Sequence, residues 1–108
     1  MDVVKRFEIY FVEFDPTKGS EINKTRPAVI ISPNEMNEVL NTVIIAPLTS
    51  TMKNYPSRIN CFVKDKNGQI ALDQLRCVDK SRLKNQLSVL NKNEQNLVLE
   101  VLYKMFSK

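Results

Sequence analysis

The apolar residues of this chain fall in short runs, rich in β-branched and aromatic side chains and separated by turn-forming residues. These runs cover residues 7–14, 28–31, 42–47, 57–63, 69–73 and 74–79. Runs of this length are too short for stable helices, and their composition favours strands. The spacing therefore predicts a mainly β fold (a β-rich α+β class), in which short antiparallel strands form a small barrel or sandwich.

Two local signals refine this prediction. Asn67-Gly68 follows an alternating strand pattern, and this dipeptide favours the type I′ turn of a β-hairpin because both of its residues adopt positive φ readily. Residues 35–40 follow a Ser-Pro-Asn segment and predict one or two helical turns.

The hydrophobic period changes near the C-terminus. Apolar residues recur there at helical spacing, at Leu97, Val98, Val101, Leu102 and Met105. Asn91 with Glu94 three residues later has the form of a capping box. We expect an amphipathic helix over residues 92–106 that packs on the sheet of the same domain rather than on a partner.

Length and composition define the class of protein. The chain has 108 residues, 43% of them hydrophobic, which is enough to build one core without disulfide or metal staples. We expect a single domain over residues 1–108, with no membrane span and no signal peptide, in the cytoplasm. Cys61 and Cys77 are expected to be small buried side chains rather than a disulfide.

The absence of histidine excludes several kinds of active site. No Ser-His-Asp, Cys-His or HExxH arrangement is possible, and the 2 cysteines and 2 glycines cannot form a zinc site, a Walker A loop or a GxGxxG loop. Any catalysis must use Arg, Lys, Thr, Ser, Asp, Glu or Tyr. The net charge of +4 fits a polyanionic partner, and it fits an ordinary basic surface equally well.

Polar residues gather where the predicted strands end. The clusters are residues 21–26, Thr49-Ser50-Thr51, Arg58, and Asp73-Gln74 with Arg76 and Asp79. Each cluster has a structural explanation: hydroxyls after a strand bond to nearby backbone, and acidic and basic side chains form cross-strand ion pairs.

Four segments, taken together, resemble the MazF/PemK family of toxin ribonucleases. They are DPTKGSE (15–21), KTRPAVI (24–30), APLTS (46–50) and LDQLRCVDKSRL (72–83), in that order. The likeness extends from about Lys5 to the terminal helix. The chain departs from the family at Asn23, where many members have glycine, and at Cys77, where threonine is frequent.

The resemblance implies an SH3-like barrel that forms a homodimer and cleaves single-stranded RNA, mRNA included, at short sequences, thereby inhibiting translation and growth. It implies no metal and no other cofactor. The implied partner is a cognate antitoxin whose acidic, disordered tail covers the RNA groove, and DNA is contacted only through that antitoxin. The implied catalytic pair is Arg26 and Thr49.

The residue types agree with this chemistry. When the substrate 2′-OH is the nucleophile, the protein must align the reacting atoms and stabilise charge on the phosphate. Arginine stays protonated in proteins, so Arg26 is expected to clamp the phosphate rather than remove a proton. The proton acceptor is Glu21 or the substrate itself.

The other polar residues suit RNA binding. Asp73 and Gln74 have hydrogen-bonding groups for base edges, Arg58 and Arg76 can hold phosphates or stack, and the lysines add salt-sensitive attraction. The full predicted set is Ser50, Arg58, Asp73, Gln74, Arg76, Lys18, Lys24 and Lys53. Two other functions remain open: a toxin of the same fold that poisons a protein such as DNA gyrase, and an RNA-binding barrel without catalysis.

Overall fold

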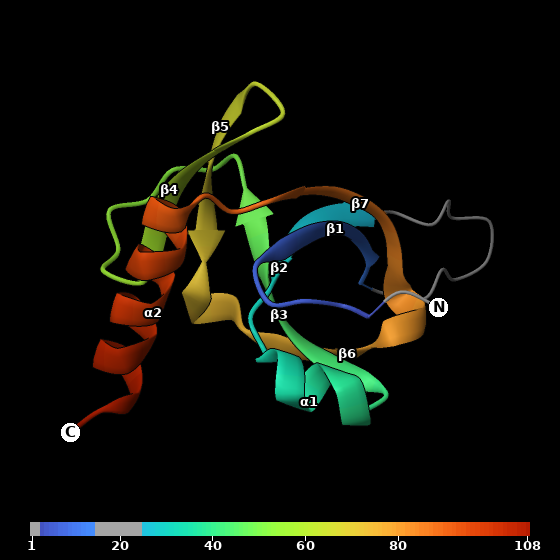
Figure 1. Cartoon of the computed structure of the whole chain (residues 1–108). Helices are drawn as coiled ribbons and strands as arrows, with labels where there is room; N and C mark the ends of the chain where they lie inside the picture. The colour runs from blue at the N-terminus through green and yellow to red at the C-terminus, as the bar shows by residue number, and fades with distance from the viewer. Residues whose placement is uncertain (1–2, 15–24) are drawn as a thin grey trace.

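A computed structural model describes residues 3–14 and 25–108 of the chain. Seven strands, two α-helices and two short 3-10 helices are assigned within these ranges (Figure 1). The elements are β1 (Glu8–Glu13), β2 (Thr25–Ile30), α1 (Asn34–Val39), β3 (Thr42–Thr49), β4 (Arg58–Val63), β5 (Lys66–Ala71), η1 (Leu72–Gln74), β6 (Arg76–Asp79), η2 (Lys80–Arg82), β7 (Leu83–Val89) and α2 (Lys92–Phe106).

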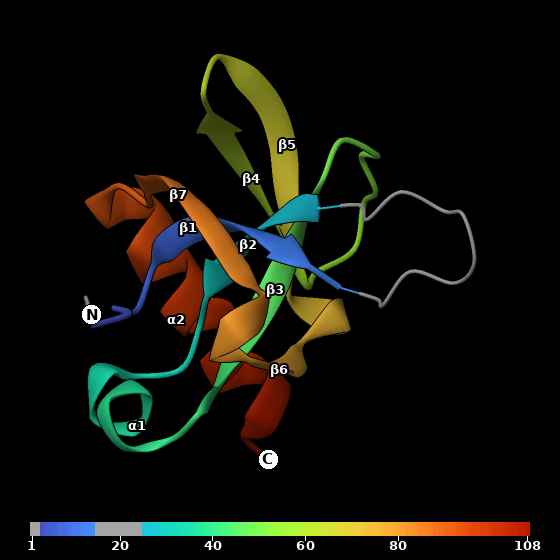
Figure 2. The ribbon, with the colours of Figure 1, turned by 90° about the vertical axis from the view of Figure 1, so that its right-hand side faces the viewer.

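The strands form one curled antiparallel sheet in the order β4-β5-β3-β2-β1-β7, and β6 also pairs with β3 (Figure 2). β3 is the strand that joins the two parts of this sheet. Along one edge it pairs first with β6, over Thr42–Ile45, and then with β5 at Leu48 and Thr49. The sheet curls into a half-barrel, so the predicted β-rich class with short antiparallel strands in a small barrel-like sheet is confirmed.

Alternation along the strands produces two hydrophobic clusters. Ile9, Val29 and Ala46 belong to the cluster that α2 covers, whereas Val12 and Ile45 belong to the cluster enclosed by the other face of the curled sheet. This division follows from the two-residue period of a strand, which sends successive side chains to opposite faces.

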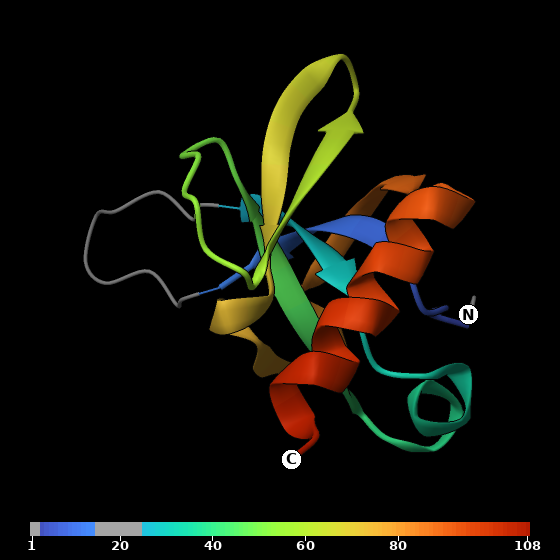
Figure 3. The same cartoon turned by 90° about the vertical axis from the view of Figure 1, so that its left-hand side faces the viewer.

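The C-terminal helix has the predicted bounds, and its capping box is formed (Figure 3). The Asn91 side chain accepts from Glu94 N at 2.8 Å, and Glu94 Oε1 accepts from Asn91 N at 3.0 Å. Val98 is fully buried, and Val101 and Leu102 pack against the same cluster. The predicted packing of this helix on the sheet is therefore confirmed.

The hairpin turn is not where the sequence placed it. Positive φ angles occur at Lys64 (52°) and Asp65 (64°), and Val63 pairs directly with Lys66. A two-residue loop therefore connects β4 and β5, and Gly68 lies inside β5 opposite Cys61. The reason lies in tertiary structure: a Cβ on Gly68 would lie 3.0 Å from the carbonyl oxygen of Thr49, so any larger residue would push the β3 backbone away, which favours glycine at this position of the strand.

Three other expectations were wrong in part. β7 was not predicted, because its residues are mostly polar and exposed, as is common for an edge strand. The run at 69–73 ends in the η1 turn instead of continuing as a strand. Cys61 is buried as expected, but Cys77 is exposed, since its neighbour Val78 takes the inward position on β6. Both thiols are free.

Within residues 3–14 and 25–108, no helix is long and apolar enough to cross a membrane.

Candidate functional site

The pairing of β2 with β3 brings Arg26 and Thr49 to the same end of the sheet. In this pair Ala28 lies opposite Pro47. This is the last pair of the ladder, and Arg26 and Thr49 each lie two residues beyond it at this end of the sheet. Both residues, together with Ser50, line a cavity of about 500 Å³. We call it the strand-end cavity.

Most of the interior of the strand-end cavity is apolar, and its charged groups are basic. The apolar lining comes from five different strands and consists of Phe11, Pro27, Leu48, Cys61, Val63 and Leu87. Its charged lining residues are Arg26, Lys64 and Lys66. Among the described lining residues there is no carboxylate, so the cavity suits an anionic ligand that also has an apolar part.

A backbone contact orients the hydroxyl of Thr49. Thr49 Oγ1 accepts a hydrogen bond from Thr51 N at 3.1 Å. Since the oxygen is used as an acceptor, the hydroxyl hydrogen remains to donate toward the cavity. The expected turn chemistry after this strand is therefore present, and it is compatible with a donor role.

The loop after Thr49 is held by the buried side chain of Gln69. Gln69 Oε1 accepts from Lys53 N at 3.0 Å, and Gln69 Nε2 donates to Lys53 O, also at 3.0 Å. The same nitrogen donates to Asn60 Oδ1 at 3.0 Å. Gln69 also pairs with Thr49 across the β3–β5 ladder. One residue thus fixes both ends of the segment from Thr49 to Lys53.

Arg26 differs from the other arginines in its contacts. Arg6 donates to Ile31 O, Arg58 pairs with Asp73, Arg76 lies over the ring of Phe14, and Arg82 pairs with Glu13. In residues 3–14 and 25–108, no hydrogen bond or ion pair engages the Arg26 guanidinium. Its donors are therefore available to a ligand in the strand-end cavity.

Comparison with known proteins places this chain in a family. The family described as "PemK-like, MazF-like toxin of type II toxin-antitoxin system" matches residues 5–106. This chain belongs to that family.

Solved structures agree with the assignment. A MazE–MazF structure from Deinococcus radiodurans is 26% identical, covers 97% of this chain and 96% of its own, and superposes with a TM-score of 0.81. An endoribonuclease in complex with its cognate antitoxin from a mycobacterial species is 22% identical over 94% of this chain and 92% of its own, with a TM-score of 0.78. The toxin MazF-mt6 of Mycobacterium tuberculosis is 18% identical over 92% and 95%, with a TM-score of 0.77. At their identities the last two establish a shared fold.

Two of the predicted RNA-binding residues of this family member bind each other. Arg58 Nε lies 2.8 Å from Asp73 Oδ1, and Arg58 Nη2 lies 3.3 Å from Asp73 Oδ2. Ser57 Oγ also donates to Asp73, at 2.9 Å, and the guanidinium lies over the ring of Tyr55. The hydrogen bond from Arg58 holds the pKa of Asp73 below its usual value, and the same bond raises the pKa of Arg58. This pair joins β4 to η1 and does not line the strand-end cavity.

The remaining predicted residues have separate positions. Gln74 is the last residue of η1, and Arg76 is the first residue of β6. Neither lines the strand-end cavity, and Arg76 Nη2 donates to Phe14 O at 3.5 Å. Lys53 contributes its backbone to Gln69, as described above. Glu21, Lys18 and Lys24 lie outside the described residues.

Sequence reasoning missed the hairpin side of the strand-end cavity. Lys64, Lys66 and Gly68 line it from β5 and its turn, and Val63 and Cys61 line it from β4. The alternation of β4 marked Cys61 and Val63 as one face, but that pattern alone cannot tell which strands face each other. Burial, and secondarily the carboxylate of Glu94, raises the pKa of the Cys61 thiol to about 11. This thiol therefore stays protonated at neutral pH and is a packing group.

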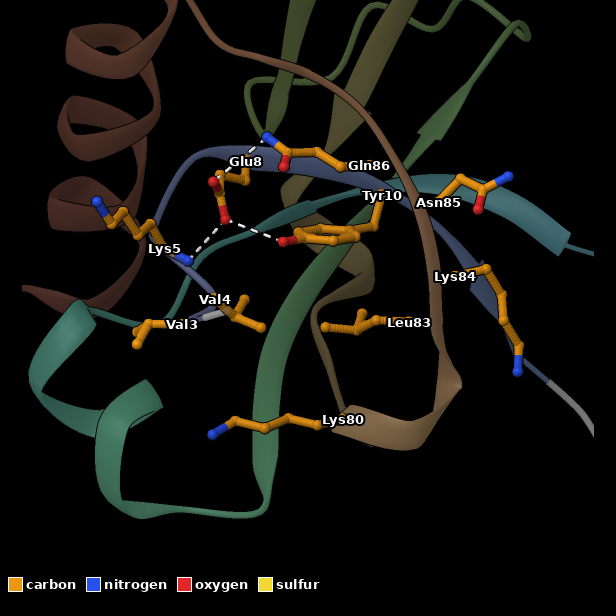
Figure 4. Close-up of a pocket in the computed structure, with 10 residues that line it drawn as sticks. All are labelled: Val3, Val4, Lys5, Glu8, Tyr10, Lys80, Leu83, Lys84, Asn85 and Gln86. Atoms are coloured by element: carbon orange, nitrogen blue, oxygen red, sulfur yellow. Dashed lines mark hydrogen bonds between the residues drawn. The ribbon is translucent and has the colours of Figure 1, made fainter. Parts of the chain in front are cut away.

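A second cavity, of about 770 Å³, lies between the N-terminal segment, β1 and β7 (Figure 4). The Glu8 carboxylate at its edge accepts from Lys5 N at 2.8 Å, from Tyr10 Oη at 3.1 Å and from Gln86 Nε2 at 3.3 Å. Lys80, another lining residue, donates to Asn37 O. None of the residues predicted to act on RNA lines this cavity. In the part of the chain that the structure describes, no group of three or more Cys, Asp or Glu side chains has the arrangement of a metal site.

Proposed function

We propose that this family member is an endoribonuclease toxin of a type II toxin–antitoxin system that cleaves single-stranded RNA at the strand-end cavity. One observation carries the proposal: Arg26 and Thr49, 23 positions apart in sequence, line one cavity whose described charged residues are all basic. A phosphodiester with its negative charge and its attached bases suits such a lining.

The proposed reaction uses the 2′-OH of the substrate as the nucleophile. The 2′-oxygen bonds to phosphorus while the bond from phosphorus to the 5′-oxygen breaks, which leaves a 2′,3′-cyclic phosphate and a 5′-OH. The 2′-proton passes to Glu21 or to an oxygen of the substrate, and the leaving 5′-oxygen takes a proton from the Arg26 guanidinium or from water. No group of the protein forms a covalent bond in this scheme.

Arg26 and Thr49 have different tasks in this scheme. The guanidinium of Arg26 donates to the non-bridging phosphoryl oxygens and stabilises their added charge in the transition state. The hydroxyl of Thr49, oriented by its contact with Thr51 N, adds a neutral donor. Ser50 and Lys53 lie after Thr49 in the segment that Gln69 holds, where they can contact the nucleotides next to the scissile phosphate.

We further propose two protein partners. The first is an acidic antitoxin, because the similar structure from Deinococcus radiodurans contains MazE with MazF, and a basic cavity is complementary to an acidic segment.

The second proposed partner is another copy of the chain. On α2, Leu99, Tyr103 and Phe106 are 40%, 75% and 73% exposed at helical spacing, and an apolar stripe of this kind is typical of an interface.

The function is tested with purified protein and a long RNA in the presence of EDTA. We expect discrete fragments with 5′-OH ends. Arg26→Ala and Thr49→Ala should each reduce the cleavage rate by about 10²–10³-fold, the usual effect of removing one transition-state donor. Arg82→Ala is the matched control, because it removes an arginine that pairs with Glu13 away from the cavity.

Two results would contradict the proposal. Intact RNA after incubation with folded wild-type protein would exclude the nuclease and favour a toxin that acts on a protein. Equal losses in Arg26→Ala and Arg82→Ala would show that the site lies elsewhere.

A further inference from the structure

The face of the β4–β5 hairpin that lines the strand-end cavity can be identified from the strand register. Residues paired across antiparallel strands point to the same face. Cys61 pairs with Gly68 and Val63 pairs with Lys66, so these four residues share the face that lines the cavity. Phe62 pairs with Asn67 on the opposite face; Asn67 also lines the cavity, whereas Phe62 does not.

This face of the hairpin provides an apolar surface with space above it. Cys61 is buried and Val63 is half-buried, and Leu48 of β3 and Leu87 of β7 line the same cavity. Gly68 adds no side chain at the position opposite Cys61. The close approach of Gly68 to Thr49 O therefore has a second consequence, which is that the cavity stays open next to the proposed catalytic pair.

Positive charge lies at the rim of this surface. Lys66 lies on the cavity face of β5, and Lys64 lies in the turn, and both line the cavity together with Arg26. Figure 3 shows that the hairpin extends beyond the rest of the sheet, so the two lysines lie on an arm. An apolar surface with cations among its lining residues is complementary to one unstacked nucleotide, whose base is flat and apolar and whose phosphates are anionic.

We propose that the hairpin face is a nucleotide subsite: Val63, Cys61 and Leu87 contact the base of a nucleotide beside the scissile phosphate, and Lys66 and Lys64 each hold one of the phosphates that flank this nucleotide. The inference rests on the proposed ribonuclease function for the position of the scissile bond. The subsite itself rests on the register and lining of the hairpin. Such a subsite would make the β4–β5 hairpin a determinant of the base preference of cleavage as well as of the affinity for RNA.

The phosphate contact is tested by the salt dependence of RNA binding. The probe is a fluorescein-labelled, single-stranded 2′-O-methyl RNA of ten nucleotides, which has no 2′-OH to attack. Each phosphate contact in single-stranded nucleic acid contributes about 0.7 to the slope of log affinity against log salt. Lys66→Ala should lower that slope by about 0.7 and the double variant with Lys64→Ala by about 1.4. Lys92→Ala, which removes an exposed lysine from the start of α2, should leave it unchanged.

The base contact is tested by sequencing the cut ends of a long RNA. Val63→Ala and Phe62→Ala shorten neighbouring side chains on opposite faces of β4, which makes them a matched pair. Val63→Ala should reduce the base preference at one position next to the cut by about 5-fold, because a change in the shape of an apolar pocket changes its discrimination between ligands by about this much or more. Phe62→Ala should retain the wild-type profile. Thermal unfolding of each variant ensures that only folded protein is compared.

The outcomes separate this inference from the proposed function. If wild-type protein cleaves RNA but the Val63→Ala profile and the Lys66→Ala slope match the wild type, the subsite is wrong and the nuclease stands. If the wild type leaves RNA intact, the nuclease fails, and the binding slope alone decides the phosphate contact. Binding of decaglutamate that depends on Lys66, without binding of the RNA probe, would assign this face to an acidic protein partner and overturn the inference.

Discussion

Gln69→Leu should slow RNA cleavage far more than its distance from the chemistry suggests. Gln69 is 6% exposed and makes three hydrogen bonds, two of them to the backbone of Lys53 and one to Asn60. These contacts hold the segment that begins at Thr49. Leucine has a similar volume but makes none of them, so the change removes the hydrogen bonds without opening a large cavity.

The magnitude follows from the hydrogen-bond partners. A hydrogen bond contributes about 0.5–1.5 kcal/mol net, and Lys53 and Asn60 are exposed, so water can replace part of what is lost. We expect the free energy of unfolding to fall by about 2 kcal/mol, which corresponds to a melting temperature about 8 °C lower. Displacement of Thr49 and its neighbours by ~1 Å should reduce kcat by about 100-fold.

The assay combines steady-state cleavage of an RNA oligomer with thermal unfolding. Gln69→Glu is a stricter variant, because a carboxylate retains the acceptor for Lys53 N but cannot donate to Lys53 O or Asn60 Oδ1. Asn60→Ala is the control. It removes one of the three hydrogen bonds, leaves both contacts with Lys53 intact, and should keep kcat within about 3-fold of wild type while costing about 1 kcal/mol.

Either of two results would show that Gln69 does not position Thr49. If Gln69→Leu is fully folded at the assay temperature and retains the wild-type kcat, the segment after Thr49 does not depend on Gln69 for its position. A loss in Asn60→Ala equal to that in Gln69→Leu would also contradict it, because the effect would then follow stability rather than the contacts with Lys53.

Two further predictions concern ionisation. The hydrogen bond from Arg58 makes the pKa of Asp73 lower in the folded protein than in the unfolded chain. The ionised Asp73 therefore stabilises the fold fully above about pH 4, and this stabilisation is lost as the pH falls through the pKa of Asp73 in the folded protein. Asp73→Asn should therefore be clearly less stable than wild type to urea at pH 7, with a smaller difference at pH 3; an equal difference at both values would contradict the assignment. A disulfide reagent at pH 8 should label Cys77 quickly and Cys61 slowly, since Cys61 is buried and its pKa is raised to about 11. Cys77→Ser should remove the fast phase, and two fast thiols in the wild type would show that Cys61 is accessible.

Local patterns were sufficient for most of the fold. The capping box at Asn91 and Glu94 uses atoms three residues apart, so α2 could be predicted to the residue. Six of the seven described strands could be recognised for the same reason, since β-branched residues and two-residue alternation act within one segment. The Arg-Pro and Leu-Thr-Ser segments also carry the family resemblance in a few consecutive residues, and they placed Arg26 and Thr49 in the predicted site.

The hairpin shows where local patterns were insufficient. Asn67-Gly68 has the sequence of a type I′ turn, yet the turn forms at Lys64-Asp65. Gly68 is needed where β5 approaches Thr49 of β3, and that contact joins residues 19 positions apart. A distant backbone atom therefore decided the role of a residue whose neighbours favoured a turn.

The strand-end cavity depends on the same kind of long-range contact. Its apolar lining comes from five strands that meet only because β3 pairs with both β2 and β5. The ion pair of Arg58 with Asp73 is likewise formed by the return of the chain through β5 to η1. Local sequence patterns were enough to predict most of the elements, the family resemblance and the residues most suited to bind a phosphate. Which of these residues share a cavity depends on strand order and register, because side-chain contacts across a sheet join residues from different segments.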